Sequence, residues 1–323
     1  MRVFIAGATG ALGVPVVRRL RAEGHTVIGL ARTHRRTQPL ASLGAQVVVA
    51  DALDADALGD AVRQARPELV VHALTAIPPH GPRRPADLNA TNALRVTGTK
   101  NLLAAAIAAG ARRVVAESMV LIYGFGEHGY TALTEDTPVA RQAPSAWLQA
   151  SLDALIAEEA LILASTRAGR IEGIVLRFGG FYGPGAGTET MIQMLRRRRL
   201  PITPGAPRHA IPWIHISDAA VAVTAALAQG RSGQMYNIAD DEAVSASDLI
   251  SHLAGAVGAP QPWSMPAWLL RLAAPFAAAA WLDTTLCVSN AKAKQELGWT
   301  PQFPTFREGM ADMARSLHPD KGI

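Results

Sequence analysis

Three glycines near the amino terminus have the spacing of a dinucleotide-binding turn. Gly7, Gly10 and Gly13 follow a β-branched run in a G-x-x-G-x-x-G pattern and lead into a segment with apolar residues at helical spacing. The first glycine permits the tight turn, the second lets the backbone approach a pyrophosphate, and the third lets the helix pack on the strand. The helix start adds free N–H groups and positive potential. We therefore expect the phosphates to be bound by Gly7, Thr9, Gly10, Ala11, Leu12 and Gly13.

The residues after the second expected strand bear on the choice between NAD and NADP. An NAD-selective site usually has Asp or Glu there, to accept hydrogen bonds from the ribose hydroxyls. Arg32 stands there instead, Arg35 and Arg36 follow, and no acidic residue occurs before Asp51. Guanidinium groups bind phosphate bidentately, so the sequence predicts NADP over NAD, with a solvated, ligand-free loop as the alternative. We expect the rest of the cofactor to contact Asp51, Ala52, Leu74, Thr75 and Ala76.

These motifs need a parallel sheet to position them. The first 120 residues alternate short β-branched runs with longer Ala/Leu-rich segments of helical period, which is typical of strands joined by crossover helices. The prediction is an α/β fold with a doubly wound parallel sheet of the Rossmann type. The expected strands are Arg2–Ala6, Thr26–Ala31, Gln46–Val49, Leu69–Ala73, Arg113–Glu117, Gly173–Arg177 and Gln234–Ile238. The expected helices are Ala11–Glu23, Asp54–Gln64, Asn89–Ala109, Trp147–Ser165, Glu189–Arg198 and Ser217–Ala228.

The second half of the chain is expected to interleave with the first. Residues 1–184 would form the dinucleotide-binding region, completed by about 209–239. Residues 185–208 and 240–323 would form a smaller substrate-binding cap over the carboxyl ends of the strands, where open α/β sheets bind ligands. No linker or repeat separates two independent units.

Charge and cysteine content exclude several classes of protein. The net charge of +5 comes from side chains spread along the chain, which is too diffuse for a nucleic-acid footprint. We interpret the one basic run, Arg196–Arg199, as the end of a helix, where positive charge suits the dipole; a clamp for a substrate phosphate is the alternative. A single cysteine, Cys287, excludes an intramolecular disulfide and favours a reducing compartment. We expect a cytoplasmic location.

Membrane and metal partners are not expected either. The most apolar stretch, Pro266–Leu286, carries Arg271, Pro275 and Asp283 and lacks the run of about 18 apolar residues that a membrane span needs. It is interpreted as buried or interfacial. The nine histidines show no pairing with Cys, Asp or Glu at ligand spacing, so we predict no metal site.

Several further segments, taken in order, resemble the short-chain dehydrogenase/reductase superfamily in its extended branch. Besides the glycine turn they are Val70–Ala73, Gly98–Ala106, Tyr123–Gly124, Leu176–Pro184, Ile214–Ala220 and Asn290–Trp299. The resemblance runs nearly end to end and is greatest to the atypical NAD(P)-dependent epimerase/dehydratase-like oxidoreductases. It implies a small-molecule substrate and suggests a homodimer.

The same resemblance implies a catalytic set that this chain lacks. The superfamily uses a Tyr-x-x-x-Lys pair in the helix after the fifth strand, with a Ser or Thr at that strand's end. Tyrosinate exchanges the proton, and lysine lowers its pKa. Here Trp147 and Ser151 stand at the Tyr and Lys positions, and Met119 stands at the hydroxyl position. Indole exchanges no proton near neutrality and serine carries no charge, so this set cannot perform the usual chemistry.

Proton transfer would then fall to another residue near the nicotinamide. We predict Tyr123 and Ser118 as the catalytic residues. Tyr182, His215 and Glu117 are further candidates, but tyrosines beside glycines often pack a turn, and a buried histidine or strand-end glutamate is often simply hydrogen-bonded.

Three functions remain open on this basis. The main prediction is an NADP-dependent oxidoreductase that acts on a small carbonyl or alcohol substrate, chiefly by holding substrate and cofactor in register. The first alternative is a sensor or scaffold that binds NADP without turnover. The second is a non-redox dehydratase or cyclase of secondary metabolism, whose hydrophobic substrate would lie against Trp263, Trp268, Phe276 and Trp281.

Overall fold

The computed structural model describes residues 1–33, 37–78, 81–203 and 210–317. Its centre is a seven-stranded sheet of order β3-β2-β1-β4-β5-β6-β9, in which every strand pair is parallel. Strand order reverses between β1 and β4, which is the point where open α/β sheets bind ligands. The doubly wound fold is thus confirmed. The strands are β1 (Arg2–Ala6), β2 (Thr26–Ala31), β3 (Gln46–Val49), β4 (Leu69–His72), β5 (Arg113–Met119), β6 (Glu172–Phe178) and β9 (Met235–Ile238).

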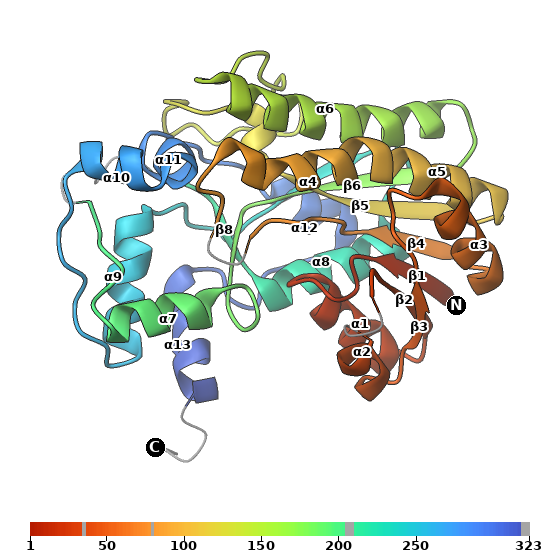
Figure 1. The fold of residues 1–323 in the computed structure, drawn as a ribbon, viewed down its shortest axis with the longest axis horizontal. Coiled ribbons are helices and arrows are strands. Elements are labelled where there is room, and N and C mark those ends of the chain that lie inside the picture. The colour runs from red at the N-terminus through yellow and green to blue at the C-terminus, as the bar shows by residue number, and fades with distance from the viewer. Residues whose placement is uncertain (34–36, 79–80, 204–209, 318–323) are drawn as a thin grey trace.

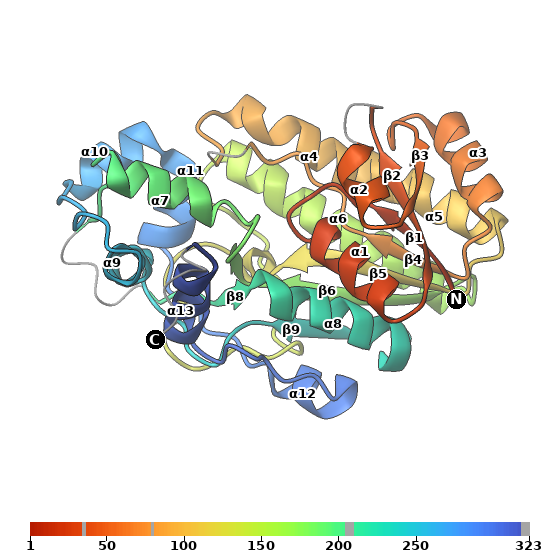
Figure 2. The ribbon, with the colours of Figure 1, turned by 90° about the horizontal axis from the view of Figure 1, so that it is seen from below.

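Helices cover both faces of this sheet (Figures 1 and 2). Successive strand residues point to opposite faces, so Val3 and Ile5 lie in one hydrophobic core, and Phe4 and Ala6 in the other. The first core is completed by α1 (Gly13–Ala22), α2 (Gln38–Ser42), α8 (Ile216–Gln229) and α12 (Ala291–Leu297). The second is completed by α3 (Ala55–Ala65), α5 (Thr99–Ala108) and α6 (Ala146–Arg167).

A smaller region lies at the end of the molecule opposite the N-terminus (Figure 1). It has a separate two-stranded sheet and its own hydrophobic core, which includes Trp213, Leu249 and Met310. Because β9 and α8 follow part of this region in the chain yet pack on the large sheet, the two halves interleave. Its elements are β7 (Gly180–Tyr182), α7 (Thr188–Arg196), β8 (Trp213–His215), α9 (Ala246–Ala256), α10 (Ala267–Ala273), α11 (Pro275–Ala277), η5 (Ala278–Leu282) and α13 (Phe306–Leu317).

The segment Asn89–Ala109, which the sequence predicts as one helix, is divided in the structure. After the short turn η2 (Pro85–Leu88), α4 (Asn89–Ala93) leads into a π-helical turn, η3 (Leu94–Gly98), before α5 begins. Single π turns inside helices often occur at functional sites. Because hydrophobic periodicity does not distinguish a π turn from an α turn, the sequence could not predict this one.

The apolar stretch Pro266–Leu286 is exposed in one part and buried in another. Helix α10 has no buried residue, and its Trp268 and Leu272 are 61% and 73% exposed, whereas Ala278 and Leu282 of η5 are buried. Within the described ranges, no helix combines the length and the apolar character needed to cross a membrane.

Candidate cofactor and active site

The glycine turn after β1 has the geometry of a phosphate cradle. Gly7 has a φ of +95°, and a Cβ atom there would lie 2.0 Å from the carbonyl oxygen of Ala73. A Cβ atom on Gly13 would lie 2.1 Å from the carbonyl oxygen of Gly7. The amide of Gly10 donates to that same carbonyl at 2.9 Å. Among the described residues, no side chain caps the start of α1, which leaves this helix end open to an anion. The turn therefore fits a dinucleotide pyrophosphate.

The other expected cofactor residues follow the carboxyl ends of neighbouring strands. Arg32 is exposed directly after β2, and Asp51 is exposed after β3, where its carboxylate accepts from the amide of Leu53 at 3.0 Å. Arg36 lies outside the described residues. The carbonyl of the buried residue Ala52 accepts from Asn101. Leu74, Thr75 and Ala76 follow β4 beside the glycine turn, together with the partly exposed Thr9 and the exposed Ala11.

The two hydroxyls predicted to be catalytic are held by a buried network. Ser118 donates to Glu159 at 2.7 Å, and the guanidinium of Arg177 donates to both oxygens of that carboxylate at 2.9 and 2.6 Å. Arg177 also donates to the Tyr123 hydroxyl at 3.0 Å, which in turn donates to Asn237 at 2.9 Å. Burial raises the pKa of Tyr123. These contacts join β5, α6, β6 and β9, and they disfavour proton exchange by either hydroxyl, whose catalytic role stays a prediction.

The positions that the superfamily gives to Tyr and Lys hold no acid and no cation. The Trp147 ring packs near the ring of Phe276, with centroids 6.2 Å apart. Ser151 is 6% exposed, and its hydroxyl has no hydrogen-bond partner among the described residues. Neither side chain offers the charge or the proton that the usual mechanism needs.

The π turn instead brings Arg95 inward, to the end of β5. Arg95 is 4% exposed, its Nη2 lies 3.3 Å from the sulfur of Met119, and its Nε lies 3.4 Å from Glu158. His72 contacts Thr99 at 2.6 Å and lies 3.6 Å from Glu158. Burial lowers the pKa of His72 to about 4 and raises that of Glu158 well above its usual value. Sequence analysis did not single out Arg95, because an arginine in a helical pattern is normally solvated.

Glu117 lies on β5, two residues before Met119. Ala116 pairs with His72 of β4, so Glu117 is level with Ala73, the residue against which Gly7 turns. Its side chain is partly exposed. Burial raises the pKa of the Glu117 carboxyl to about 7, against the positive charge of Arg95, which lowers it. A carboxyl that titrates near neutrality at the cofactor edge of the sheet can act as an acid or a base.

The two remaining candidates lie in the core of the smaller region. Tyr182 donates to Asp240 at 2.7 Å, and its ring meets the fully buried His215 ring at a centroid distance of 5.2 Å. The Phe303 ring also packs against the His215 ring, with centroids 4.3 Å apart. Burial raises the pKa of Tyr182 and lowers that of His215 to about 4. This packing fixes β7 and β8 to the C-terminal segment.

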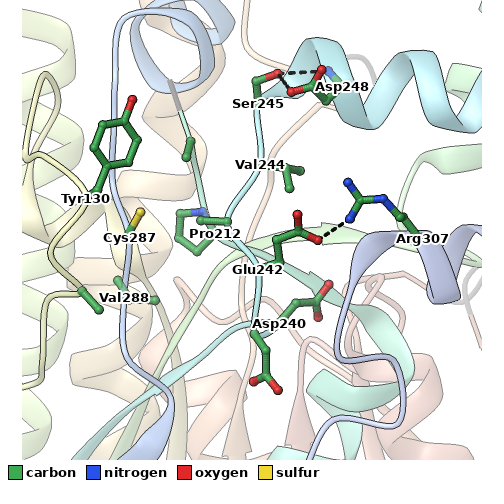
Figure 3. A pocket seen from close by; sticks show the side chains of 14 residues that line it. Tyr130, Pro212, Asp240, Glu242, Val244, Ser245, Asp248, Cys287, Val288 and Arg307 are labelled. Carbon is green, nitrogen blue, oxygen red and sulfur yellow. Dashed lines mark hydrogen bonds and ion pairs between the residues drawn. The ribbon is translucent and has the colours of Figure 1, made fainter. Parts of the chain in front are cut away.

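A cavity of about 540 Å³ lies between this C-terminal segment and the loops around residues 130 and 287 (Figure 3). Acidic side chains of its lining have partners: Arg307 donates to Glu242, and Ser245 donates to Asp248 at 2.7 Å. The lining includes no residue that the sequence assigned to the cofactor. In the part of the chain that the structure describes, no group of three or more His, Cys, Asp or Glu residues could hold a metal ion. The labelled lining residues are Tyr130, Pro212, Asp240, Glu242, Val244, Ser245, Asp248, Cys287, Val288 and Arg307.

Comparison with known protein families shows to which family the chain belongs. Residues 3–239 match the model of the NAD dependent epimerase/dehydratase family. The chain belongs to this family. A relative from a Streptomyces species, named 3-diazoavenalumate denitrifying reductase, is 38% identical over 96% of this chain and 99% of its own length. A 2-alkyl-3-oxoalkanoate reductase from Stenotrophomonas maltophilia is 26% identical over 81% of this chain and 77% of its own length. The expected membership in the extended short-chain dehydrogenase/reductase superfamily is confirmed.

Solved structures of the family share the fold. The UDP-glucose 4-epimerase of Thermotoga maritima, solved with UDP-glucose, superposes with a TM-score of 0.81 at 19% identity and covers 99% of both chains. The dTDP-glucose 4,6-dehydratase of Bacillus anthracis, solved with NAD, gives a TM-score of 0.77 at 19% identity, over 99% of this chain and 97% of its own. The Rossmann-type architecture is thus the one on which this family binds its nicotinamide cofactor.

Proposed function

We propose that this chain is an NADP-dependent reductase whose hydride acceptor is a diazo compound. The observation that carries the proposal is the contrast between two parts of one site. The cradle around Gly7 and Gly13 admits a dinucleotide, whereas Met119, Trp147 and Ser151 stand in place of the family's proton-transfer set. A site that keeps its hydride donor and lacks the usual acid suits an acceptor that does not need that acid.

The chemistry of a diazo group meets this condition. Reduction of a carbonyl makes an alkoxide, which needs a proton at oxygen as the hydride arrives. In a diazo compound the hydride forms a C–H bond while the C–N bond breaks, and its electron pair leaves with N₂. The negative charge that the hydride brings stays on the conjugated product anion, which takes a proton from solvent after N₂ has left, so no acid is needed as the hydride arrives. The 38% identical relative is named for the reduction of a diazo compound, which supports the same class of substrate here.

The preference for NADP rests on the end of β2. Arg32 is exposed there, at the place where an NAD site usually has a carboxylate. A guanidinium binds a phosphate bidentately and repels no part of it. We propose that Gly7, Thr9, Gly10, Ala11, Leu12 and Gly13 hold the pyrophosphate, and that Arg32, Arg36, Asp51, Ala52, Leu74, Thr75 and Ala76 contact the adenosine and ribose parts.

The test is a pair of titrations on the purified full chain. NADPH and NADH are titrated by fluorescence, and the absorbance of the reduced nicotinamide is then followed with 3-diazoavenalumate and, in parallel, with a panel of aldehydes and ketones. The proposal predicts tighter binding of NADPH and oxidation with the diazo compound only. Oxidation with carbonyls alone would replace the diazo substrate by a carbonyl. Binding without oxidation by any compound would favour the sensor.

A further inference from the structure

We propose that Arg95 binds the negative charge that hydride transfer leaves on the product. The ligand class is a conjugated organic anion, such as a phenolate or an enolate, held at the end of β5. This inference rests on the proposed reductase function, since it concerns the charge that the hydride brings. It is carried by a buried guanidinium whose N–H donors form no hydrogen bond with an oxygen atom of the described residues.

The π turn η3 brings Arg95 to the end of β5. Arg95 is 4% exposed, and its Nη2 lies 3.3 Å from the sulfur of Met119, the last residue of that strand. Met119 is partly exposed and stands at the position at which the family carries its catalytic hydroxyl. A substrate whose reacting group lies at this position would therefore have the Arg95 guanidinium as its neighbouring cation.

Two buried arginines lie beside neighbouring glutamates of α6, and they differ in how well their donors are satisfied. Arg177 donates to both carboxylate oxygens of Glu159, at 2.9 and 2.6 Å, and to a tyrosine hydroxyl at 3.0 Å. Arg95 lies 3.4 Å from Glu158, but that oxygen of Glu158 accepts no hydrogen bond from a described residue. In the described part of the chain, the Arg95 side chain has one acceptor, the thioether of Met119, which is a weak one. Arg177 is thus a satisfied structural residue, whereas the buried donors of Arg95 still need an acceptor.

The charged groups of this region do not neutralise Arg95. The other titratable side chains here are His72 on β4, Glu158 and Glu159 on α6, Arg177 on β6 and, on the other face of the sheet, Glu117 on β5. Burial raises the pKa of Glu158 well above its usual value, which favours the neutral acid, and it lowers the pKa of His72 to about 4, so the ring is neutral. Glu159 is paired with Arg177, and burial raises the pKa of Glu117 to about 7. Below this pH the positive charge of Arg95 has no ionised partner, and a buried cation without one favours the binding of an anion.

Met119 is the side chain that an anion would displace from Arg95. A methionine side chain is unbranched and flexible, and this one is partly exposed where Arg95 is buried. A thioether accepts hydrogen bonds weakly, whereas an anionic oxygen accepts charge-assisted hydrogen bonds that are roughly twice as strong as neutral ones. The exchange of the thioether for an anionic oxygen is therefore favourable.

The proposed step balances in atoms and charge. Hydride leaves the nicotinamide and forms a C–H bond at the diazo carbon. The C–N bond breaks, and its electron pair leaves with N₂. The negative charge of the hydride stays on the conjugated product anion, which pairs with Arg95 and takes a proton from solvent after N₂ has left. Arg95 gives up no proton, so this role agrees with an acceptor that needs no acid.

The first test compares wild type with Arg95→Met and Arg95→Lys, using 3-diazoavenalumate and NADPH. Arg95→Met removes the charge and is expected to lower kcat by about 10²–10³-fold, the usual cost of losing a donor that stabilises an anion, and to leave NADPH affinity unchanged. Arg95→Lys keeps the charge and is expected to regain part of this loss. Arg113→Met is the matched control, because Arg113 pairs with Glu172 at the opposite end of the sheet. A wild-type kcat in Arg95→Met would overturn the proposal. Arg95→Gln, which also removes the charge, serves if the Met variant does not fold.

The second test does not need turnover. 4-Nitrophenol is titrated against pH by absorbance in the presence of the full chain and NADP⁺, because its ionised form is both coloured and a conjugated anion. Wild type is expected to raise the acid dissociation constant of the bound phenol about 10-fold or more, since a nearby cation favours the ionised form. Arg95→Met is expected to remove this effect, and Arg95→Lys to retain part of it. Nitrobenzene, which cannot ionise, is expected to bind wild type and Arg95→Met equally.

The outcomes separate this inference from the proposed function. If 3-diazoavenalumate is not reduced but 4-nitrophenol ionises as stated, only the proposed function fails. If 4-nitrophenol ionises equally with wild type and Arg95→Met, Arg95 is not the anion site, whatever the substrate. Benzoate binding that depends on Arg95, without any effect on 4-nitrophenol, would make Arg95 an anchor for a substrate carboxylate and would also overturn the inference.

Discussion

A Cβ atom on Gly7 would lie 2.0 Å from the carbonyl oxygen of Ala73, so the phosphate-binding turn and the residue after β4 leave no room for a side chain. Gly7 also has a φ of +95°, a conformation that other residues rarely adopt. The close approach of these two residues sets the shape of the cradle at the switch point of the sheet. It also gives a direct way to perturb the cofactor site.

Gly7→Ala is expected to abolish NADPH binding and to destabilise the fold, because the new methyl group must displace backbone. Gly24→Ala is the matched control, since Gly24 has a similar φ of +81° but, its chain neighbours aside, no atom of the described residues lies within 4 Å of its Cβ position. In the control, the free energy of unfolding is expected to fall only by what the left-handed conformation costs an alanine, about 1 kcal/mol. Urea unfolding and fluorescence titration measure both effects. Equal losses of stability in the two variants would show that the contact with Ala73 is unimportant.

Arg32→Ala is expected to weaken NADPH binding about 10-fold or more, a loss of about 1.4 kcal/mol, and to leave NADH binding nearly unchanged. The reason is that only NADPH carries the 2′-phosphate that the guanidinium would meet. Arg63→Ala, on the exposed side of α3, is the control for the loss of one positive charge. Parallel weakening of both cofactors would show that Arg32 does not select between them.

Tyr123→Phe separates a structural role of the hydroxyl from a catalytic one. The variant leaves Arg177 and Asn237 each without one buried partner, so we expect a loss of about 1–3 kcal/mol in the free energy of unfolding. The rate of NADPH oxidation is expected to change by less than about 10-fold, since a catalytic acid contributes 10²–10⁴-fold. Tyr130→Phe, at a tyrosine that is 63% exposed, is the control. A large loss of rate in a stable Tyr123→Phe protein would establish Tyr123 as the proton donor.

His72 is expected to make stability depend on pH. Its pKa is about 4 in the folded chain and 6.5 when unfolded. The unfolded state therefore binds more protons between these values, and stability falls as the pH drops from 6.5 toward 4. The full effect is on the order of 3 kcal/mol. His72→Gln should remove this part of the pH dependence in urea unfolding at pH 7 and pH 4.5, whereas His252→Gln should not. The same slope in wild type and His72→Gln would contradict the account.

Local patterns predicted the sheet well. The strands Arg2–Ala6, Thr26–Ala31 and Gln46–Val49 have the expected bounds, because β-branched runs between turn residues are strong signals in a parallel sheet. The glycine turn could be predicted equally well, since the spacing of its glycines follows from backbone sterics. The expected divisions of the chain, the homodimer and the cytoplasmic location stay predictions.

The active site could not be predicted to the same depth. Arg95 looks like any charged residue of a helix, and only the π turn shows that it points inward. Ser118 and Tyr123 were chosen because they carry hydroxyls near the end of β5, but their partners, Glu159 and Arg177, come from distant α6 and β6. Sequence spacing does not reveal such long-range pairing.

Hydride transfer from labelled cofactor tests the central claim most directly. NADPH deuterated at each of the two C4 positions in turn is incubated with the full chain and 3-diazoavenalumate, and the product is analysed by mass spectrometry. The account predicts that one of the two labelled cofactors transfers deuterium to the carbon that carried the diazo group, in an amount equal to the NADPH oxidised. Bound NADPH with no deuterium in any product would contradict a reductase.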